Sequence, residues 1–228
     1  MIYRFALRPS TVLSLQKGCL VSDATAAAIV SSANPMLMGS EHQRNAWKHA
    51  GRASVDAAIH AAAGPALLAA CRALPPRRRR ASRDGAGEEG GGAEERVATG
   101  GAVATAGSFG ELRAAHVIHC ACPRAEWGTE QAPAEDVRAL RRTYASCLAC
   151  AARLRVPSIA FPAVGIGVCA FPAAQAAQAA LAALLGDDGA CWPELREVQF
   201  VFREPRALEA WLAEAAARKL RPLPRGEM

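Results

Sequence analysis

The chain has 228 residues, of which 51% are hydrophobic, and this suffices for one domain with a sizeable core, which we expect over residues 1–228. The net charge of +6 includes a run of four arginines at 77–80, and only 5% of residues are aromatic. This composition argues against a nucleic-acid partner, because such a face needs basic and aromatic residues spread over a folded surface. No apolar run is long enough to span a bilayer and no secretory signal pattern is present, so we expect no membrane partner and a cytoplasmic or nuclear location.

The first two predicted strands are residues 3–7 and 11–15, where apolar and polar residues alternate. A buried strand is predicted from Ala28, because three apolar residues follow one another there. The strand ends in small and polar residues: Ser31, Ser32, Ala33 and Asn34. A helical pattern begins at Val55, with Ser54 or Asp56 as its cap, and should end near Gly64.

This order of strand, loop and helix places Asn34, Asp56 and His60 near the C-terminal end of a strand, where open α/β sheets bind ligands. Each residue also has a purely structural interpretation. Asp56 can cap the helix, Asn34 can close a turn, and His60 can be a half-buried helix residue.

Taken together, these residues resemble the macrodomain family. In that family a strand ends in Asn-Ala-Ala-Asn, and a glycine-rich loop leads into Val-Asp-Gly-Ala-Ile-His-x-Ala-Ala-Gly. Here residues 31–34 read SSAN and residues 55–64 read VDAAIHAAAG. The resemblance implies a three-layer α/β/α sandwich with a mixed central sheet and an ADP-ribose cleft at the strand ends. The alternating strands and helices independently favour an α/β sandwich.

Two segments depart from the family pattern before this helix. The family's Gly-Asp-Ile-Thr motif, whose aspartate meets the adenine amino group, corresponds to Gly18 followed by Cys19; Asp23 is near but at a different spacing. Between Gly39 and Gly51 the short glycine-rich loop is replaced by SEHQRNAWKHA. The basic residues of this insert can contact an anionic ligand, or the insert can be a mobile surface loop.

A second helical pattern over 67–74 ends at two prolines. The following stretch, 76–96, consists mainly of arginine, glycine and glutamate, and we expect a disordered insertion within the domain. We interpret its arginines as solvated, with a nuclear localisation signal or a weak polyanion contact as the alternative. At the other end of the chain, residues 221–228 are expected to form a short tail.

Strands are predicted around 102–107 and 116–123, and both segments resemble macrodomain strands. His119 is interpreted as a structural residue at a strand end and not as a catalyst. A helix is predicted over 137–154, a strand over 198–202 and a closing helix over 205–219.

The eight cysteines raise the question of a zinc site, because Cys147 and Cys150 have C-x-x-C spacing and Cys120 and Cys122 form a closer pair. A zinc site prefers two pairs beside turns, whereas these pairs lie in a helical stretch and an apolar strand. We interpret the cysteines as small core residues and expect no metal and no other cofactor.

A loop of small residues follows a predicted strand at 159–161 and precedes a helix that begins near 173. Such a loop at a helix N-terminus suits a phosphate. It resembles the macrodomain phosphate loop, although Gly165 replaces a hydroxyl residue, Cys169 replaces the aromatic that packs by the distal ribose, and Ala170 replaces a glycine. The loop residues expected to contact the ligand are Gly165, Ile166, Gly167, Val168 and Cys169.

The resemblance implies a metal-free ADP-ribose-ester hydrolase, acting on ADP-ribosylated proteins or on O-acetyl-ADP-ribose. Asp56 would orient or deprotonate water, His60 would orient Asp56 or the substrate, and Asn34 would hold the distal ribose. The remaining ligand contacts are expected from Ser31, Ser32, Ala33, Gly39 and Val55. The partner is therefore ADP-ribose or an ADP-ribosylated protein or metabolite, bound by a monomer. A non-catalytic reader and a hydrolase of an ADP-ribose phosphate are the alternatives.

Overall fold

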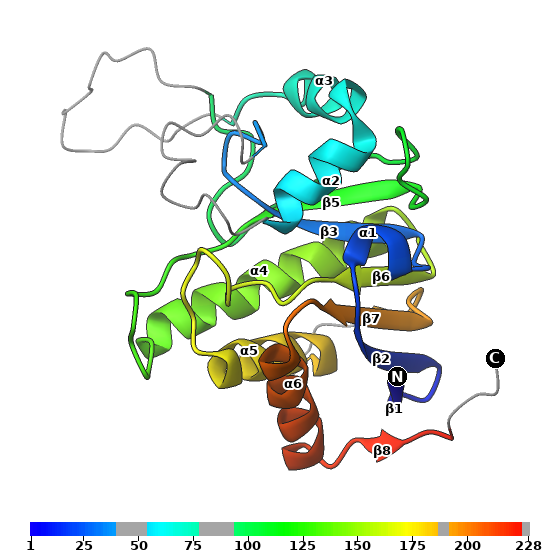
Figure 1. Cartoon of the computed structure of the whole chain (residues 1–228), viewed down its shortest axis with the longest axis vertical. Helices are drawn as coiled ribbons and strands as arrows, with labels where there is room; N and C mark the ends of the chain where they lie inside the picture. Colours follow the sequence, from blue (N-terminus) through cyan, green and yellow to red (C-terminus); the bar gives the residue numbers. More distant parts are fainter. Residues whose placement is uncertain (40–53, 78–93, 187–191, 225–228) are drawn as a thin grey trace.

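The computed structural model describes residues 1–39, 54–77, 94–186 and 192–224, and none of the helices within these ranges is long and apolar enough to cross a membrane (Figure 1). The elements are, in chain order, β1 (Ile2–Arg8), β2 (Thr11–Lys17), α1 (Leu20–Asp23), β3 (Ala28–Ala33), α2 (Val55–Ala63), α3 (Pro65–Ala73), β4 (Ala102–Ala106), β5 (His116–Ala121), α4 (Ala134–Arg153), β6 (Ser158–Phe161), α5 (Ala173–Leu185), β7 (Glu197–Phe202), α6 (Pro205–Ala217) and β8 (Arg221–Pro222).

The strands form one mixed sheet in the order β4-β5-β3-β6-β7-β2-β1-β8. The inner strands from β5 to β2 are parallel, whereas β4 at one edge and β1 and β8 at the other are antiparallel to their neighbours. The chain passes from β3 towards β5 on one side, and from β6 towards β7 on the other. Connections therefore diverge between β3 and β6, and in open α/β sheets ligands bind beyond the carboxyl ends of the strands at such a point.

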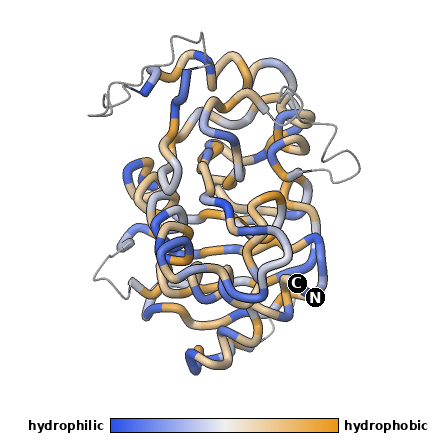
Figure 2. The backbone as a smooth tube through the Cα atoms, turned by 90° about the vertical axis from the view of Figure 1, so that its left-hand side faces the viewer, coloured by the Kyte–Doolittle hydropathy of each residue, from blue (hydrophilic) through white to orange (hydrophobic). Residues whose placement is uncertain are grey.

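Helices cover both faces of this sheet, which confirms the predicted α/β/α layers. On one face α2 and α3 bury a cluster that includes Ile29, Ile59 and Leu67. On the other face α4, α5 and α6 bury a larger cluster that includes Val30 and Leu140. Hydrophobic and hydrophilic residues alternate along the chain in Figure 2, as expected for elements that each bury one side.

The predicted strands and helices are present, with margins that differ by one to three residues, and the main differences are the following. The helix α4 begins at Ala134, three residues before the predicted 137. The short helix α1 was not predicted; the Asp23 carboxylate accepts a hydrogen bond from the Cys19 N–H at 2.7 Å and so closes this turn locally. The prediction of a tail over 221–228 is wrong at its start, because β8 pairs with β1 and the Leu223 N–H donates to the Arg4 carbonyl at 2.9 Å.

The predicted insertion at 76–96 is described only at its two ends. There the Arg77 N–H donates to the Glu95 carbonyl at 2.7 Å, and the two side chains form an ion pair at 3.3 Å. The Arg96 guanidinium donates to the Arg72 carbonyl at the end of α3, at 3.1 Å. The two ends of the insertion therefore lie together beside α3. The prediction of disorder concerns mainly residues 78–93, which lie outside the described residues.

An aromatic group in the larger core gives a test of this packing. The Trp211 side chain on α6 is 0% exposed, and its ring centroid lies 5.1 Å from that of Phe202. Trp211→Ala should lower the free energy of unfolding by about 3–5 kcal/mol, because it leaves a cavity that its neighbours fill only in part. Trp127, which is 59% exposed, is the matched control, and Trp127→Ala should cost less than about 1 kcal/mol. Urea unfolding followed by circular dichroism measures both, and equal losses would contradict this packing.

Candidate active site

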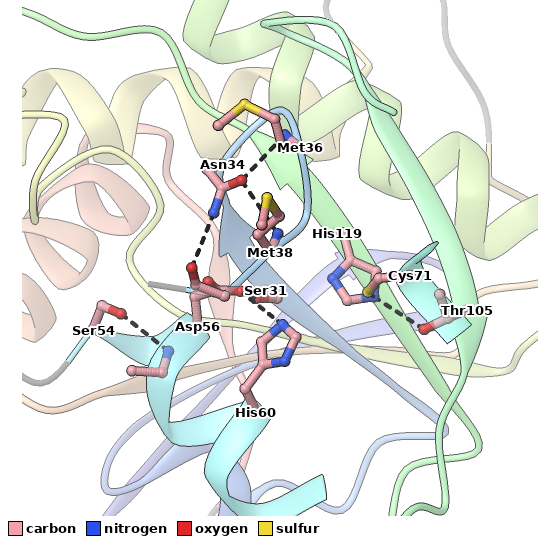
Figure 3. A network of polar contacts seen from close by, with 12 residues as sticks. Ser31, Asn34, Met36, Met38, Ser54, Asp56, His60, Cys71, Thr105 and His119 are labelled. Carbon is pink, nitrogen blue, oxygen red and sulfur yellow. Dashed lines mark hydrogen bonds and ion pairs between the residues drawn. The ribbon is translucent and has the colours of Figure 1, made fainter. Parts of the chain in front are cut away.

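Asp56 lies in the first turn of α2 and faces the end of β3 (Figure 3). Its carboxylate accepts a hydrogen bond from the Ser31 hydroxyl at 2.7 Å, and the residue is only 1% exposed. The helix is capped by Ser54, whose hydroxyl accepts from the Ala57 N–H at 3.0 Å. Ser54 therefore fills the capping role that the sequence left open between Ser54 and Asp56, and Asp56 instead ties α2 to the central strand.

His60 lies one helical turn beyond Asp56, on the same side of α2. Its Nε2 atom is 3.8 Å from Asp56 Oδ1, which is longer than a hydrogen bond, and it has no hydrogen-bond partner among the described residues. The ring also packs against Gly39, where a Cβ would lie 3.4 Å from it and where φ is +71°. The side chain as a whole is 14% exposed, but Nε2 itself is buried, so this atom faces the protein beside Asp56 and not the solvent.

Asn34 uses its side chain to shape the turn that follows β3. Its Oδ1 accepts from the N–H groups of Met36 at 3.1 Å and Met38 at 3.4 Å, and its Nδ2 donates to the Gly39 carbonyl at 3.4 Å. The structural interpretation of Asn34 is therefore confirmed. Its contact with a ribose stays a prediction, and the Asn34 side chain would have to make it while keeping these hydrogen bonds of the turn.

The other residues near β3 that are predicted to contact the ligand differ in their solvent exposure. Ser31 is 0% exposed and its hydroxyl donates to Asp56, so its predicted contact with a ligand stays a prediction. Ser32 and Ala33 at the end of β3 are half-buried, as is Val55 at the start of α2. Residues 40–53, which hold the predicted basic insert, lie outside the described residues.

The loop between β6 and α5 has a backbone fixed by its neighbours. The Tyr144 hydroxyl of α4 donates to the Val164 carbonyl at 2.9 Å, and the Phe171 N–H donates to the Gly165 carbonyl at 2.9 Å. Gly165 has a φ of +102°, and a Cβ there would lie 2.9 Å from Leu140. The glycine that replaces a hydroxyl residue in this chain is thus required by the local backbone.

The same loop presents donors to solvent. Within the part of the chain that the structure describes, the backbone N–H groups of Gly167, Val168 and Cys169 make no hydrogen bond. Gly167 is exposed, and the two residues after it are partly exposed. Successive unpaired N–H groups just before a helix form a site suited to an anion, because they carry partial positive charge.

His119 on β5 is confirmed as a structural residue. It is 0% exposed, and its Nε2 lies 3.0 Å from the Thr105 hydroxyl and 3.7 Å from the Cys71 sulfur. Burial, together with the nearby His60, lowers the pKa of His119 to about 3. The imidazole is therefore neutral at pH 7 and does not serve as an acid in this site.

The cysteines are in part the core residues that the sequence predicted. Those buried are Cys71, Cys120, Cys147 and Cys150. The interpretation is wrong for Cys19, which is exposed beside α1, while Cys122 and Cys169 are only partly buried. Across the described ranges, no three histidine, cysteine or acidic side chains converge as a metal site would require.

Two contributions to the site were missed by sequence reasoning. The Ser31–Asp56 bond could have been found, because alternation along β3 places Ser31 on the same face as Ile29, the face that α2 covers. The Tyr144 bond to Val164 joins residues of α4 and of the loop after β6, and no local pattern signals it.

Comparisons with known proteins agree with this geometry. The Macro domain family model matches residues 30–180. An O-acetyl-ADP-ribose deacetylase of Salmonella gallinarum is 37% identical over 154 residues, which cover 68% of this chain and 67% of that protein. One of Cronobacter sakazakii is 35% identical over 173 residues, covering 76% and 77%. A mutant macrodomain of Oceanobacillus iheyensis with ADPR superposes with a TM-score of 0.69 at 24% identity, covering 96% and 98%, which supports the shared fold.

The low pKa of His119 predicts a pH dependence of stability. Between pH 3 and pH 6.5 the unfolded chain binds a proton at this residue that the folded chain does not, so stability rises with pH over this range. The stabilisation that depends on a neutral His119 is fully present above pH 6.5. Below pH 6.5 the free energy of unfolding falls by up to about 1.4 kcal/mol per pH unit. His119→Gln should remove this part of the slope, as measured by urea unfolding at several pH values from 4.5 to 7. Parallel slopes for the two proteins would contradict the assignment.

Proposed function

The chain belongs to the Macro domain family, and we propose on this basis that it binds ADP-ribose and hydrolyses ADP-ribose esters. Relatives at 35–37% identity are named O-acetyl-ADP-ribose deacetylases, and such an ester or an ADP-ribosylated protein is the proposed substrate. The observation that carries the proposal is the buried carboxylate of Asp56, held by Ser31 beside the diverging connections of β3 and β6.

The diphosphate of ADP-ribose would bind the loop after β6. Its charge matches the unpaired N–H groups of Gly167, Val168 and Cys169, and no basic side chain is needed for this contact. Because β6 pairs directly with β3, a ligand held there extends past the end of β3 towards Asp56. By holding the diphosphate, the loop after β6 would fix how far the ester of the ligand lies from Asp56.

In the proposed reaction a water attacks the ester carbonyl while Asp56 accepts its proton. The carboxylate is 1% exposed, so a water that enters with the substrate is the one it activates. Collapse of the tetrahedral intermediate breaks the bond between the carbonyl carbon and the ribose oxygen. Asp56 returns the proton to this oxygen, which leaves as a hydroxyl of ADP-ribose, while the acyl group with the oxygen from water leaves as a carboxylic acid. Ser31 acts as a positioning residue, because its hydrogen bond fixes the carboxylate, and His60 Nε2 helps to orient water or substrate.

A second candidate function is a reader that binds ADP-ribose without turnover. It is favoured by Asn34, whose side-chain oxygen and nitrogen are both engaged in its own turn and so are less available to fix a ribose. A hydrolase of an ADP-ribose phosphate stays the further alternative. It depends on histidines at 42 and 49, which lie outside the described residues.

Replacement of Asp56 separates an enzyme from a reader. Asp56→Asn should lower kcat for O-acetyl-ADP-ribose by about 10²–10⁴-fold, because the amide cannot accept the proton. ADP-ribose affinity, measured by titration calorimetry, should change much less. Glu135→Gln in the exposed first turn of α4 is the matched acid-to-amide control and should leave both unchanged. Binding with no turnover by the unmodified protein would identify a reader, and no binding would overturn the proposal.

Ser31 gives a separate test of the positioning role. Ser31→Ala removes the hydrogen bond to Asp56 and should lower kcat by about tenfold with little change in KM, because a misoriented base acts only in the transition state. Ser31→Thr keeps the hydroxyl and should restore most of the loss. If the alanine variant instead raises KM at constant kcat, Ser31 contributes to ground-state binding and not to orientation.

A further inference from the structure

The turn that follows β3, residues 34–39, has a backbone conformation that must be held in place. Leu37 has a φ of +56° and Gly39 has a φ of +71°. A left-handed backbone is ordinary for glycine but unusual for a side chain as large as leucine. Such a conformation persists only where the surrounding contacts determine it. The contacts of this turn are therefore informative about its role.

Asn34 supplies most of the hydrogen bonds within the turn (Figure 3). Its backbone carbonyl accepts from the Leu37 N–H at 3.0 Å. Its side-chain oxygen accepts from the N–H groups of Met36 and Met38, and its side-chain nitrogen donates to the Gly39 carbonyl at 3.4 Å. Because Asn34 is only 7% exposed, water cannot easily replace these bonds. One side chain thus ties the first residue of the turn to its last.

Other contacts anchor the middle of the turn to the protein. The Leu37 side chain is 1% exposed and lies in the same buried cluster as Ile59 of α2. The Pro35 carbonyl accepts from the Val97 N–H at 3.1 Å. The bond from the Asn34 amide extends this anchoring to the last residue of the turn.

Gly39, at the end of the turn, lies over the face of the His60 ring. A Cβ at Gly39 would be 3.4 Å from Cγ, 3.5 Å from Cδ2 and 3.6 Å from Nδ1 of His60. Nearly equal distances to three adjacent ring atoms place the glycine above the plane of the imidazole and not beyond its edge. Since Gly39 is buried, its backbone covers the ring on this side.

The ring that Gly39 covers carries the nitrogen that lies beside Asp56. His60 Nε2 is 3.8 Å from Asp56 Oδ1, and this buried atom has no hydrogen-bond partner within the described ranges. No hydrogen bond to Nε2 therefore fixes the rotation of the ring, and its orientation depends on the groups packed against it. Gly39 is one of these groups.

We propose that Asn34 is a positioning residue for His60. By holding the turn closed, Asn34 keeps Gly39 against the imidazole and so keeps Nε2 beside Asp56. This role needs no contact between Asn34 and a ribose. Its consequence for turnover rests on the proposed function, in which His60 Nε2 helps to orient water or substrate. Small displacements of such a group are costly, because the reaction needs a defined geometry.

Nuclear magnetic resonance of the ligand-free, full-length protein tests the contact itself. We expect an Overhauser effect between an α proton of Gly39 and the Hδ2 proton of His60, whose signals His60→Gln identifies among the five histidines. Asn34→Ala removes the side-chain bonds and should abolish this effect. Gln178→Ala, at an exposed position of α5, is the matched control and should keep it. Circular dichroism verifies folding, and an unchanged effect in folded Asn34→Ala would overturn the inference.

Gly39→Ala perturbs the same contact from the side of the glycine. The added methyl group would press on the His60 ring, so the ring signals should shift and kcat for O-acetyl-ADP-ribose should fall about tenfold. Gly128→Ala is the control for backbone strain. Gly128 has a φ of +81°, and a Cβ there would meet no described atom within 4 Å, so kcat should be unchanged. Equal losses of kcat in the two variants would contradict a role of the ring contact.

A double-mutant cycle tests whether Asn34 acts through His60. Asn34→Ala should lower kcat about tenfold in the unmodified protein but less than about twofold in His60→Gln, because the ring that it positions is then absent. Titration calorimetry should show little change in ADP-ribose affinity. Equal losses of kcat in both backgrounds, or a large loss of affinity, would indicate a direct ligand contact of Asn34 and overturn the inference.

The two proposals fail in different ways. If the unmodified protein neither binds ADP-ribose nor hydrolyses its esters, the proposed function is overturned. The Overhauser measurement, which needs no ligand, would then decide whether Asn34 positions His60.

Discussion

The parallel pairing of β3 with β6 is the constraint on which the site depends. Ala28 pairs with Ile159 and Ile29 with Ala160, so both strands end at the same edge of a sheet that is buried on both faces. The loops that follow must therefore start side by side. Connections diverge on the two sides of this pair, and open α/β sheets bind ligands beyond the carboxyl ends of the strands at such a point. The turn at Asn34 and the loop at 165–169 are functional neighbours for this reason.

The bond between Ser31 and Asp56 builds the reacting end of the site on this frame. A carboxylate that is 1% exposed is stable only when it is well hydrogen-bonded, and the strand supplies the donor. The same bond fixes the rotation of α2 about its axis and so places His60 on the side that faces Gly39. One short contact thus joins the central strand to the helix that carries both Asp56 and His60.

The opposite face of the sheet supports the proposed binding end of the site. Tyr144 fixes the phosphate loop from α4, and Cys169 ends the row of unpaired N–H groups. The proposed anion-binding loop is therefore held from α4, whereas Asp56 lies on the α2 side of the sheet.

Local patterns determined much of this protein. Apolar runs and caps determined the inner strands and the helices from α2 to α6, because burial on two faces leaves a continuous apolar signature in sequence. The motif around Asp56 and His60 determined the family and the candidate catalytic residues. Contacts between distant residues were decided only by the tertiary structure. The Ser31 hydroxyl donates to Asp56, Asn34 is engaged in its turn, and Arg221 joins the sheet. Such pairs depend on which strands lie side by side, and strand order is set by the packing of the whole sheet, which no local pattern encodes.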